Sequence, residues 1–290
     1  MSFHDIFIGP FADFDFMRRA LVGSIILALS AGPTGVFLMV RRMSLAGDAM
    51  SHAILPGVAL GFVVAGLQIL PMTFGGLIAG LLVALLAGTV SRVTSLKEDA
   101  SLAAFYLLSL ALGVMLVSLS GSNVDLVHIL FGTVLALNNA ALILIAAVAS
   151  MTFIALAIIW RALFLECLDP GFLRSVSKLG PMAHFSFLIL VVLNLVAGFQ
   201  ALGTLLSVGL VILPAVSARF WVQRLESLCL LAALIGVASS YVGLLLSYHF
   251  NLVTGPAIIL VCGAAYIVSV LFSPRGLFAA QARPHRHKAA

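Results

Sequence analysis

The feature that most constrains this chain is a series of long apolar runs separated by short polar stretches. They fall at roughly 20–40, 52–70, 73–91, 100–119, 131–160, 183–200, 201–218, 228–248 and 253–272. A helix that crosses the hydrocarbon core of a bilayer needs about 20 mostly apolar residues, which is the length of these runs. Strands of a membrane barrel are about 10 residues long and alternate apolar with polar side chains, a pattern absent here. The sequence therefore predicts an all-α, polytopic integral membrane protein with eight or nine transmembrane helices.

The composition also indicates a chain built for lipid. Charged residues make up only 9% of the 290 residues, whereas soluble domains have about 25%. The net charge of +5 comes from basic residues spread through the expected loops, which indicates membrane orientation rather than a nucleic-acid surface. Cys167, Cys229 and Cys262 lie far apart without a CxxC pair, so we expect neither a disulfide framework nor a cysteine zinc site.

The chain is expected to form one membrane domain with short polar flanks. Residues 1–19 mix aromatic and acidic side chains and lack the features of a cleavable signal peptide, so we expect an interfacial segment. The transmembrane domain is expected over 20–272, and 273–290 should form a polar cytoplasmic tail. The longest polar interruption, 161–182, carries both basic and acidic residues and should hold a short amphipathic helix.

Charge decides part of the orientation. Basic loops are expected on the cytoplasmic side, and the loop at 161–182 is one of them. Counting spans back from this loop places 41–47 inside and the N-terminus outside. That count requires 183–200 and 201–218 to be separate spans. Because the turn between them is very short, a broken or re-entrant pair of helices is the alternative.

Asp48 and His52 are the first candidates for a chemical site. Four residues apart on a helix, they share one face with Cβ atoms about 5–6 Å apart. Ionisable groups near the membrane interior are rare and usually face a cavity or pathway. A carboxylate and an imidazole supply half of a tetrahedral metal shell, and a two-fold dimer would bring the other half. The alternative is that Asp48 caps a helix starting near Ala49 while His52 hydrogen-bonds a neighbour.

Two prolines and a second Asp–His pair are further candidates. Pro56 follows His52 by one turn and predicts a helix kink, which could line a cavity or serve packing. Pro214 predicts a second helix kink; it follows small residues of the kind found at close helix contacts, where packing is the favoured interpretation. Asp125 and His128 stand just outside a helix start and could draw a cation to a pore mouth, although helix capping is the favoured explanation.

Several enzyme motifs are missing from the sequence. There is no G-x-x-x-x-G-K-[ST] loop, so the chain is not expected to hydrolyse ATP itself. There is no H-E-x-x-H motif and no nucleophile elbow, which argues against a membrane protease or esterase. An intramembrane enzyme with His52 as base beside Ser51 would lack an acid or oxyanion motif. A secondary cation transporter could use Asp48 and His52 as a proton relay, but no inverted repeat is evident.

Four blocks of the sequence carry a resemblance to a known family. The first is AGPTGVFLMVRRMSLAGDAMSHAILPGVALGF at 31–62, with a GD…H…G spacing. The others are VDLVHILFG at 124–132, LGTLLSVGLVILPAVSAR at 202–219 and GPAIILVCGAAYIVS at 255–269. Together they resemble the permease subunit of bacterial metal-ion ABC importers of the zinc/manganese type. Thr133 departs from the family, in which an acidic residue is common at that position.

The resemblance implies a division of labour among subunits. In that family two permease copies enclose the pathway, two cytoplasmic ATP-binding subunits drive alternating access, and a periplasmic binding protein delivers the metal. By analogy, Asp48 and His52 would bind the ion, with Asp125 and His128 near the pathway entry.

The resemblance also implies a contact with the ATPase. The stretch LDPGFLRSVSKLG at 168–180 falls where the family has its cytoplasmic coupling helix. Phe172 and Leu173 depart from the family's usual acidic or Ala-rich pattern there. The residues expected at this contact are Asp169, Pro170, Phe172 and Leu173.

The sequence therefore predicts a homodimeric, non-enzymatic transport subunit in the bacterial cytoplasmic (inner) membrane. Zinc is the expected substrate because SLAGDAMSHA and AGPTG are closest to the zinc branch of the family. A carboxylate with an imidazole also suits manganese and iron, so an importer of either metal is the alternative. No permanently bound cofactor is expected beside the transported Zn²⁺ or Mn²⁺. A cobalamin or siderophore permease would share the architecture but is expected to line a wide cavity without a central Asp–His pair.

Overall fold

The computed structural model describes residues 7–66, 68–119, 137–168 and 179–278, and within these ranges all regular structure is α-helical. The helices are α2 Gly9–Asp13, α3 Asp15–Val40, α4 Ala46–Ala53, α5 Leu55–Ala65, α6 Ile69–Val93, α7 Glu98–Leu119, α9 Asn139–Leu168, α11 Leu179–Leu202, α12 Thr204–Arg219, α13 Leu225–Phe250 and α14 Thr254–Phe272. The described residues contain 8 spans long and apolar enough to cross a membrane, one of them formed by α4 and α5 together. The predicted all-α polytopic fold is confirmed.

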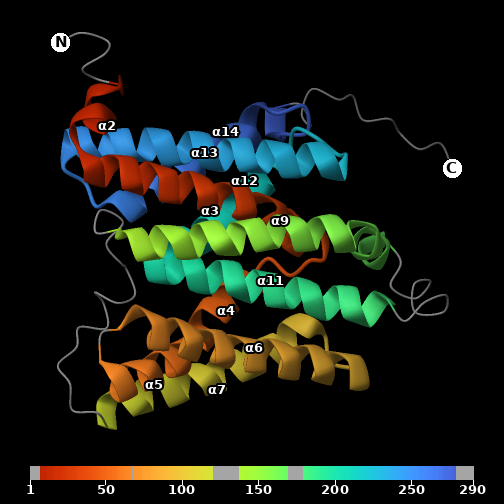
Figure 1. Ribbon diagram of the computed structural model, residues 1–290. Coiled ribbons are helices and arrows are strands. Elements are labelled where there is room, and N and C mark those ends of the chain that lie inside the picture. The colour runs from red at the N-terminus through yellow and green to blue at the C-terminus, as the bar shows by residue number, and fades with distance from the viewer. Residues whose placement is uncertain (1–6, 67, 120–136, 169–178, 279–290) are drawn as a thin grey trace, which may run out of the picture.

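The helices run side by side and form three groups (Figure 1). The α5 and α6 helices pack on each other, and α4, α5 and α6 all contact α7. On the opposite side, α3 packs against α12 and α13, and α14 covers α12 and α13. The α9–α11 pair lies between these groups, with α9 against α3 and α11 against α6. The α11–α6 contact therefore joins the α4–α7 group to the rest of the bundle.

The α12 helix explains why the sequence left the number of spans open. It has 16 residues, fewer than any of the 8 span-length helices. Only Gly203 separates it from α11, and this residue has φ 93, a value that side-chain-bearing residues rarely adopt. The apolar pattern runs through both helices, so the break is visible in the sequence only as one glycine.

The α3 helix ends in a tight left-handed turn. The N–H of Met43 donates to the carbonyl of Leu38 at 2.8 Å, and the N–H of Arg42 donates to that of Met39 at 3.0 Å. This pair of bonds is the Schellman motif, and Arg42 occupies its left-handed position with φ 60. Because Leu38 and Met43 are both buried in the core, the turn anchors the chain just before α4 begins.

The expected interfacial segment 1–19 includes the start of the first long helix. The α3 helix begins at Asp15, whose carboxylate in the first turn complements the helix dipole. Ahead of it, the ring of Phe11 in α2 stacks on that of Tyr241 in α13, with ring centroids 5.3 Å apart.

The polar interruption expected over 161–182 is shorter in the structure, which corrects that boundary. The α9 helix continues to Leu168, and α11 begins at Leu179. Residues 161–168 contain no glycine or proline that would end a helix. Pro170 is the first proline after them, and a proline disfavours helical backbone in the residue before it.

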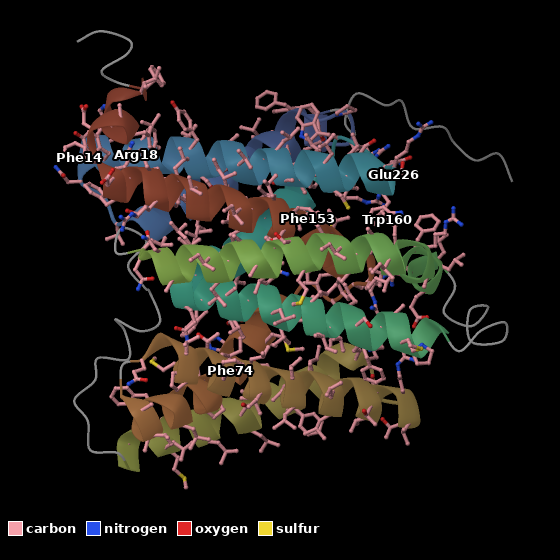
Figure 2. All side chains as sticks on the ribbon, viewed as in Figure 1. Phe14, Arg18, Phe74, Phe153, Trp160 and Glu226 are labelled. Carbon is pink, nitrogen blue, oxygen red and sulfur yellow. The ribbon has the colours of Figure 1, made fainter. Side chains whose placement is uncertain are left out.

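The described basic residues lie mostly at one end of the bundle. The helix order alternates direction along the chain, so Arg18 and Arg19 at the start of α3 lie at the opposite end (Figure 2). By the positive-inside rule, the end richer in Lys and Arg faces the cytoplasm, and we call it the basic end. Its described basic residues are Arg41, Arg42, Arg92, Lys97, Arg161, Arg219, Arg224 and Arg275.

Candidate functional site

Asp48 and His52 lie on one face of α4, as their spacing predicts. The His52 Nε2 and Asp48 Oδ1 atoms are 3.8 Å apart. The residue at the helix N-cap is Leu45, and Asp48 falls within the first turn without a side-chain capping bond. The capping alternative therefore does not describe this carboxylate. The side chain of Asp48 is 65% exposed and that of His52 is 36% exposed, so both remain open to a ligand.

A small cavity lies between α4 and α7 beside this pair. Its volume is about 160 Å³, and its polar lining includes Asp48, Asp99 and Tyr106. The ring of Tyr106 also lies 6.3 Å from that of His52, measured between centroids. Asp99 thus brings a second carboxylate from another helix to the cavity. The sequence spacing did not reveal it, because Asp99 lies at the start of α7, far in sequence from Asp48.

The backbone around His52 is opened by Pro56. A proline has no N–H, so the His52 carbonyl lacks its usual partner four residues on. The helix is interrupted at Ile54, and α5 starts with Pro56 in its first turn. The next carbonyl, that of Ala53, accepts a hydrogen bond from the Ser109 hydroxyl of α7 at 2.8 Å. This bond ties the opened segment to α7, the helix that also carries Asp99 and Tyr106.

One copy of the chain places two side chains of metal-ligand type, Asp48 and His52, close together. Within the described ranges, no group of three or more His, Cys, Asp or Glu side chains is arranged to hold a metal ion. A tetrahedral shell requires four ligands. The Asp48–His52 pair can therefore hold an ion firmly only with ligands from another chain, from water, or from residues outside those ranges.

Of the other predicted site residues, Pro214 lies within the part of the chain that the structure describes, and the rest lie outside it. Pro214 is buried inside α12, where the helix continues without a break. Asp125 and His128 lie outside the described residues. So do the four residues expected at the ATPase contact, Asp169, Pro170, Phe172 and Leu173.

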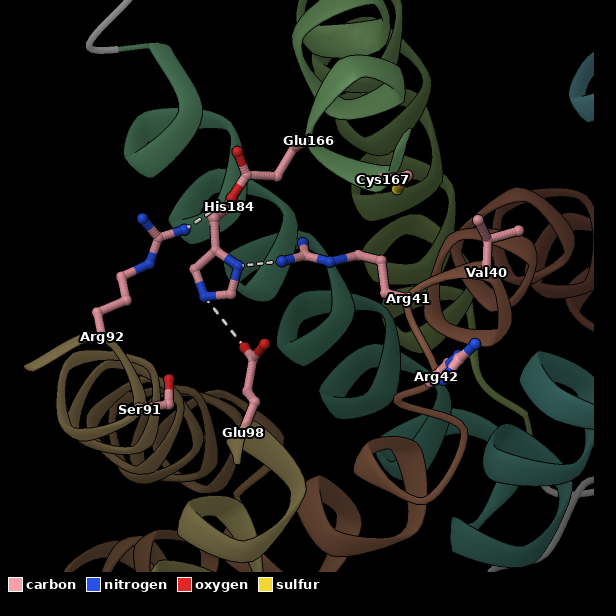
Figure 3. A pocket seen from close by; sticks show the side chains of 9 residues that line it. All are labelled: Val40, Arg41, Arg42, Ser91, Arg92, Glu98, Glu166, Cys167 and His184. Carbon is pink, nitrogen blue, oxygen red and sulfur yellow. Dashed lines mark hydrogen bonds and ion pairs between the residues drawn. The ribbon is translucent and has the colours of Figure 1, made fainter. Parts of the chain in front are cut away.

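A buried charged network, which the sequence analysis did not identify, joins helix ends at the basic end (Figure 3). At its centre is His184 of α11, whose side chain is 2% exposed. The guanidinium of Arg41, just after α3, donates to the His184 Nδ1 atom. Since a guanidinium has only donors, Nδ1 must accept, which leaves Nε2 to carry the ring hydrogen. The Nε2 atom lies 3.1 Å from the Glu98 Oε1 atom of α7.

An ion pair between two other helices lies beside this contact. The Arg92 guanidinium of α6 lies 3.0 Å from the Glu166 carboxylate of α9, whose side chain is only 3% exposed. Both pairs border a cavity of about 340 Å³. The sequence signal for these contacts was the presence of ionisable residues inside apolar helices. It did not identify Glu166, because that residue was expected in a loop. His184 and Glu98 are too far apart in sequence for local spacing to reveal their contact.

These features define a class of protein. Within the described residues, eight spans long and apolar enough to cross a membrane, an open Asp–His pair in one of them and buried charged side chains at the basic end are features of a membrane transport protein. The model of the ABC 3 transport family matches residues 13–273. The chain therefore belongs to the ABC 3 transport family.

Relatives and solved structures agree with this assignment. The chain is 32% identical over 269 residues to the "Manganese import system permease protein ScaB" of Streptococcus gordonii, covering 93% of this chain and 95% of ScaB. It is 30% identical over 260 residues to the "Probable iron transport system membrane protein" of Haemophilus influenzae, covering 90% and 94% of the two chains. The structure titled "PsaBC from Streptococcus pneumoniae in complex with Fab" matches with a TM-score of 0.82 at 30% identity, covering 96% and 99%. The resemblance to permease subunits of metal-ion ABC importers is confirmed.

Proposed function

We propose that this chain is the membrane permease of an ATP-driven importer of a divalent transition metal, and that Asp48 and His52 supply half of its transport site. The observation that carries the proposal is the open Asp48–His52 pair, with 3.8 Å between Oδ1 and Nε2, inside a membrane-crossing span. An exposed carboxylate is costly against lipid, so it is expected to face a water-filled pathway or another subunit. Its membership of the ABC 3 family supports a transport role.

A two-fold homodimer would complete the site. Because a two-fold interface brings the same surface of both chains together, one pair of α4 helices would offer two carboxylates and two imidazoles. That set gives the four ligands of a tetrahedral shell, or four of the ligands of a larger one. Asp99, in the cavity beside Asp48, would add negative charge that attracts a cation.

The names of the relatives favour manganese over the zinc expected from the sequence. ScaB is named for manganese and the Haemophilus relative for iron. A carboxylate and imidazole set accommodates all three metals, so geometry rather than ligand type must select among them. We therefore propose manganese as the substrate and keep zinc as the competing outcome.

The charged network offers a route from ATP hydrolysis to the metal site. Glu166 lies two residues before the end of α9, and His184 lies in the second turn of α11, so they flank the expected coupling loop. Their polar contacts, to Arg92 and Glu98, reach α6 and α7, which pack on α4 and α5. A partner ATPase that moves this loop would thereby pull on the group of helices that carries Asp48 and His52. A binding protein on the outer side would deliver the metal.

Metal binding to the assembled transporter tests the site. We expect wild type to bind one Mn²⁺ per pair of permease chains, measured by electron paramagnetic resonance, and Asp48→Asn and His52→Ala to lose this binding. His249→Ala is the matched control, since the His249 Nδ1–H donates locally to the Leu245 carbonyl at the end of α13. Retention of stoichiometric Mn²⁺ or Zn²⁺ in folded His52→Ala would remove the pair from the site.

A further inference from the structure

A hollow at the basic end, between α9 and the α12–α13 corner, has no role in the transport cycle proposed above. Its volume is about 840 Å³, within the range of small-molecule sites, about 300–1,000 Å³. Most of its wall is apolar: α9 contributes Trp160, Phe164 and Leu165, and α13 contributes Leu225 and Leu228. We call it the basic hollow because of the side chains at its rim.

Three arginines from three elements line this hollow. Arg161 comes from α9, Arg219 from the end of α12, and Arg224 from the residue before α13. All three are exposed, and none of them forms an ion pair with a described residue. The described lining contains a single carboxylate, that of Glu226. The hollow therefore carries an excess of positive charge that an anion would neutralise.

The position of the hollow along the helices matches the level of lipid headgroups. With 30 residues, α9 is about 45 Å long, which exceeds the hydrocarbon thickness of about 30 Å. Arg161 lies seven residues before its end, or about 10 Å along the axis. The side chain of Trp160 next to it is of the kind that prefers the membrane interface. Trp160 and Glu226 lie at the same end of the bundle (Figure 2).

Among the described residues, α9 and α13 form the two walls of this site without packing closely on each other. The α9 helix packs on α3 and α11, whereas α13 packs on α3, α12 and α14. Arg161 lies on one wall and Arg224 on the other. Exposed Phe164 and Leu168 extend the apolar wall of α9 past the rim.

We propose that the basic hollow binds an anionic phospholipid of the cytoplasmic leaflet. The guanidinium groups of Arg161, Arg219 and Arg224 hold the phosphate, for which their planar, multiple donors are suited. The acyl chains lie along the apolar side chains of α9 and α13. Basic pockets between transmembrane helices on the cytoplasmic side are recognised sites for such headgroups.

Fluorescence quenching in the complete transporter tests the proposal. The chain has two tryptophans, Trp160 and Trp221, so Trp221→Phe leaves Trp160 as a reporter inside the hollow. We expect brominated phosphatidylglycerol to quench Trp160 at a membrane fraction on the order of tenfold lower than brominated phosphatidylcholine. The reciprocal reporter, Trp160→Phe, leaves Trp221, which donates to the Ser269 hydroxyl outside the hollow and should show no such preference.

Charge variants separate this site from general attraction to an anionic membrane. Arg161→Gln with Arg219→Gln and Arg224→Gln should abolish the preference at Trp160. Lys97→Gln with Arg275→Gln removes charge from the same end outside the hollow and should leave the preference intact.

Three results would overturn the proposal. Equal quenching of Trp160 by the two lipids would show that the hollow does not select the headgroup. Displacement of phosphatidylglycerol by inorganic phosphate or glycerol phosphate at millimolar concentration would make it a site for free phosphate. Loss of the ATPase subunits from the triple arginine variant, with no lipid preference in wild type, would make it a protein docking surface.

Discussion

Single residues near Asp48 show what sequence spacing can and cannot predict. The Asp48–His52 pair was predictable because both residues lie on one helix, where a separation of four fixes their common face. Asp99 reaches the same cavity from α7. Local sequence spacing does not predict a contact between two different helices. The left-handed Arg42 was also unpredictable, since glycine is the usual residue at that position of a helix end.

Asp99→Asn tests whether the second carboxylate of the cavity assists the metal site. We expect the Mn²⁺ concentration for half-maximal uptake to rise about tenfold, the loss typical of removing a group that supports metal ligands. The measurement is the dependence of uptake on Mn²⁺ concentration in proteoliposomes. Lys97→Gln is the control, because Lys97 is exposed. An unchanged concentration dependence would separate Asp99 from transport.

Arg42→Gly tests the strain at the end of α3. A residue other than glycine is destabilised by about 1–2 kcal/mol in the left-handed region. Glycine relieves this strain but also has greater freedom in the unfolded chain, which offsets part of the gain. The variant should therefore raise the free energy of unfolding by up to about 1 kcal/mol. Thermal unfolding in detergent measures this effect. Arg42→Ala removes the same charge without relieving the strain, and an equal gain in that variant would assign the effect to charge.

The helices themselves were the most predictable part of the molecule. Each apolar run corresponds to a helix because a spanning segment must satisfy its backbone internally. The interruption of the helix at Ile54 was predicted as a kink from Pro56. The extension of α9 through Glu166 was not predicted, and there the Glu166 carboxylate lies buried beside Arg92. That contact is a tertiary one, which local sequence spacing does not reveal.

Gly57→Ala tests a close approach between two helices, α5 and α6. A Cβ atom at Gly57 would lie 1.9 Å from the carbonyl oxygen of Gly75, so the helices would have to separate. We expect Gly57→Ala to lower the free energy of unfolding by about 1–3 kcal/mol, which is the usual cost of adding an atom to a well-packed core. Gly263→Ala is the matched control, because a Cβ atom there meets nothing within 4 Å. Equal thermal unfolding of the two variants would contradict this packing.

At the scale of the whole molecule, the Arg92–Glu166 ion pair and the Glu98–His184 contact connect groups of helices that otherwise meet mainly through α6 and α11. Arg92 and Glu166 are 74 positions apart, so local sequence spacing could not predict their pairing. Because the two contacts lie at both ends of the expected coupling loop, the proposed function makes them the connection between a partner ATPase and the metal site.

Glu166→Ala tests this connection. Removing one partner of a buried ion pair costs about 3–5 kcal/mol, whereas replacing both by apolar residues is often nearly neutral. We therefore expect Glu166→Ala to lower thermal stability markedly and Arg92→Met with Glu166→Met to recover most of it. If the pair carries the coupling, the stable double variant should still hydrolyse ATP but import metal several-fold more slowly. Normal uptake per ATP in the double variant would show that coupling runs elsewhere.

The most direct test of the central claim is ATP-dependent uptake by the complete transporter in proteoliposomes, comparing manganese with zinc and wild type with His52→Ala. The account predicts uptake of manganese in preference to zinc, and its loss in His52→Ala while the permease stays folded and bound to its ATPase. Preferred uptake of zinc that is lost in the variant would keep the site and change the substrate. Uptake that survives in His52→Ala would contradict the account, because the ion would then cross the membrane without the Asp48–His52 pair.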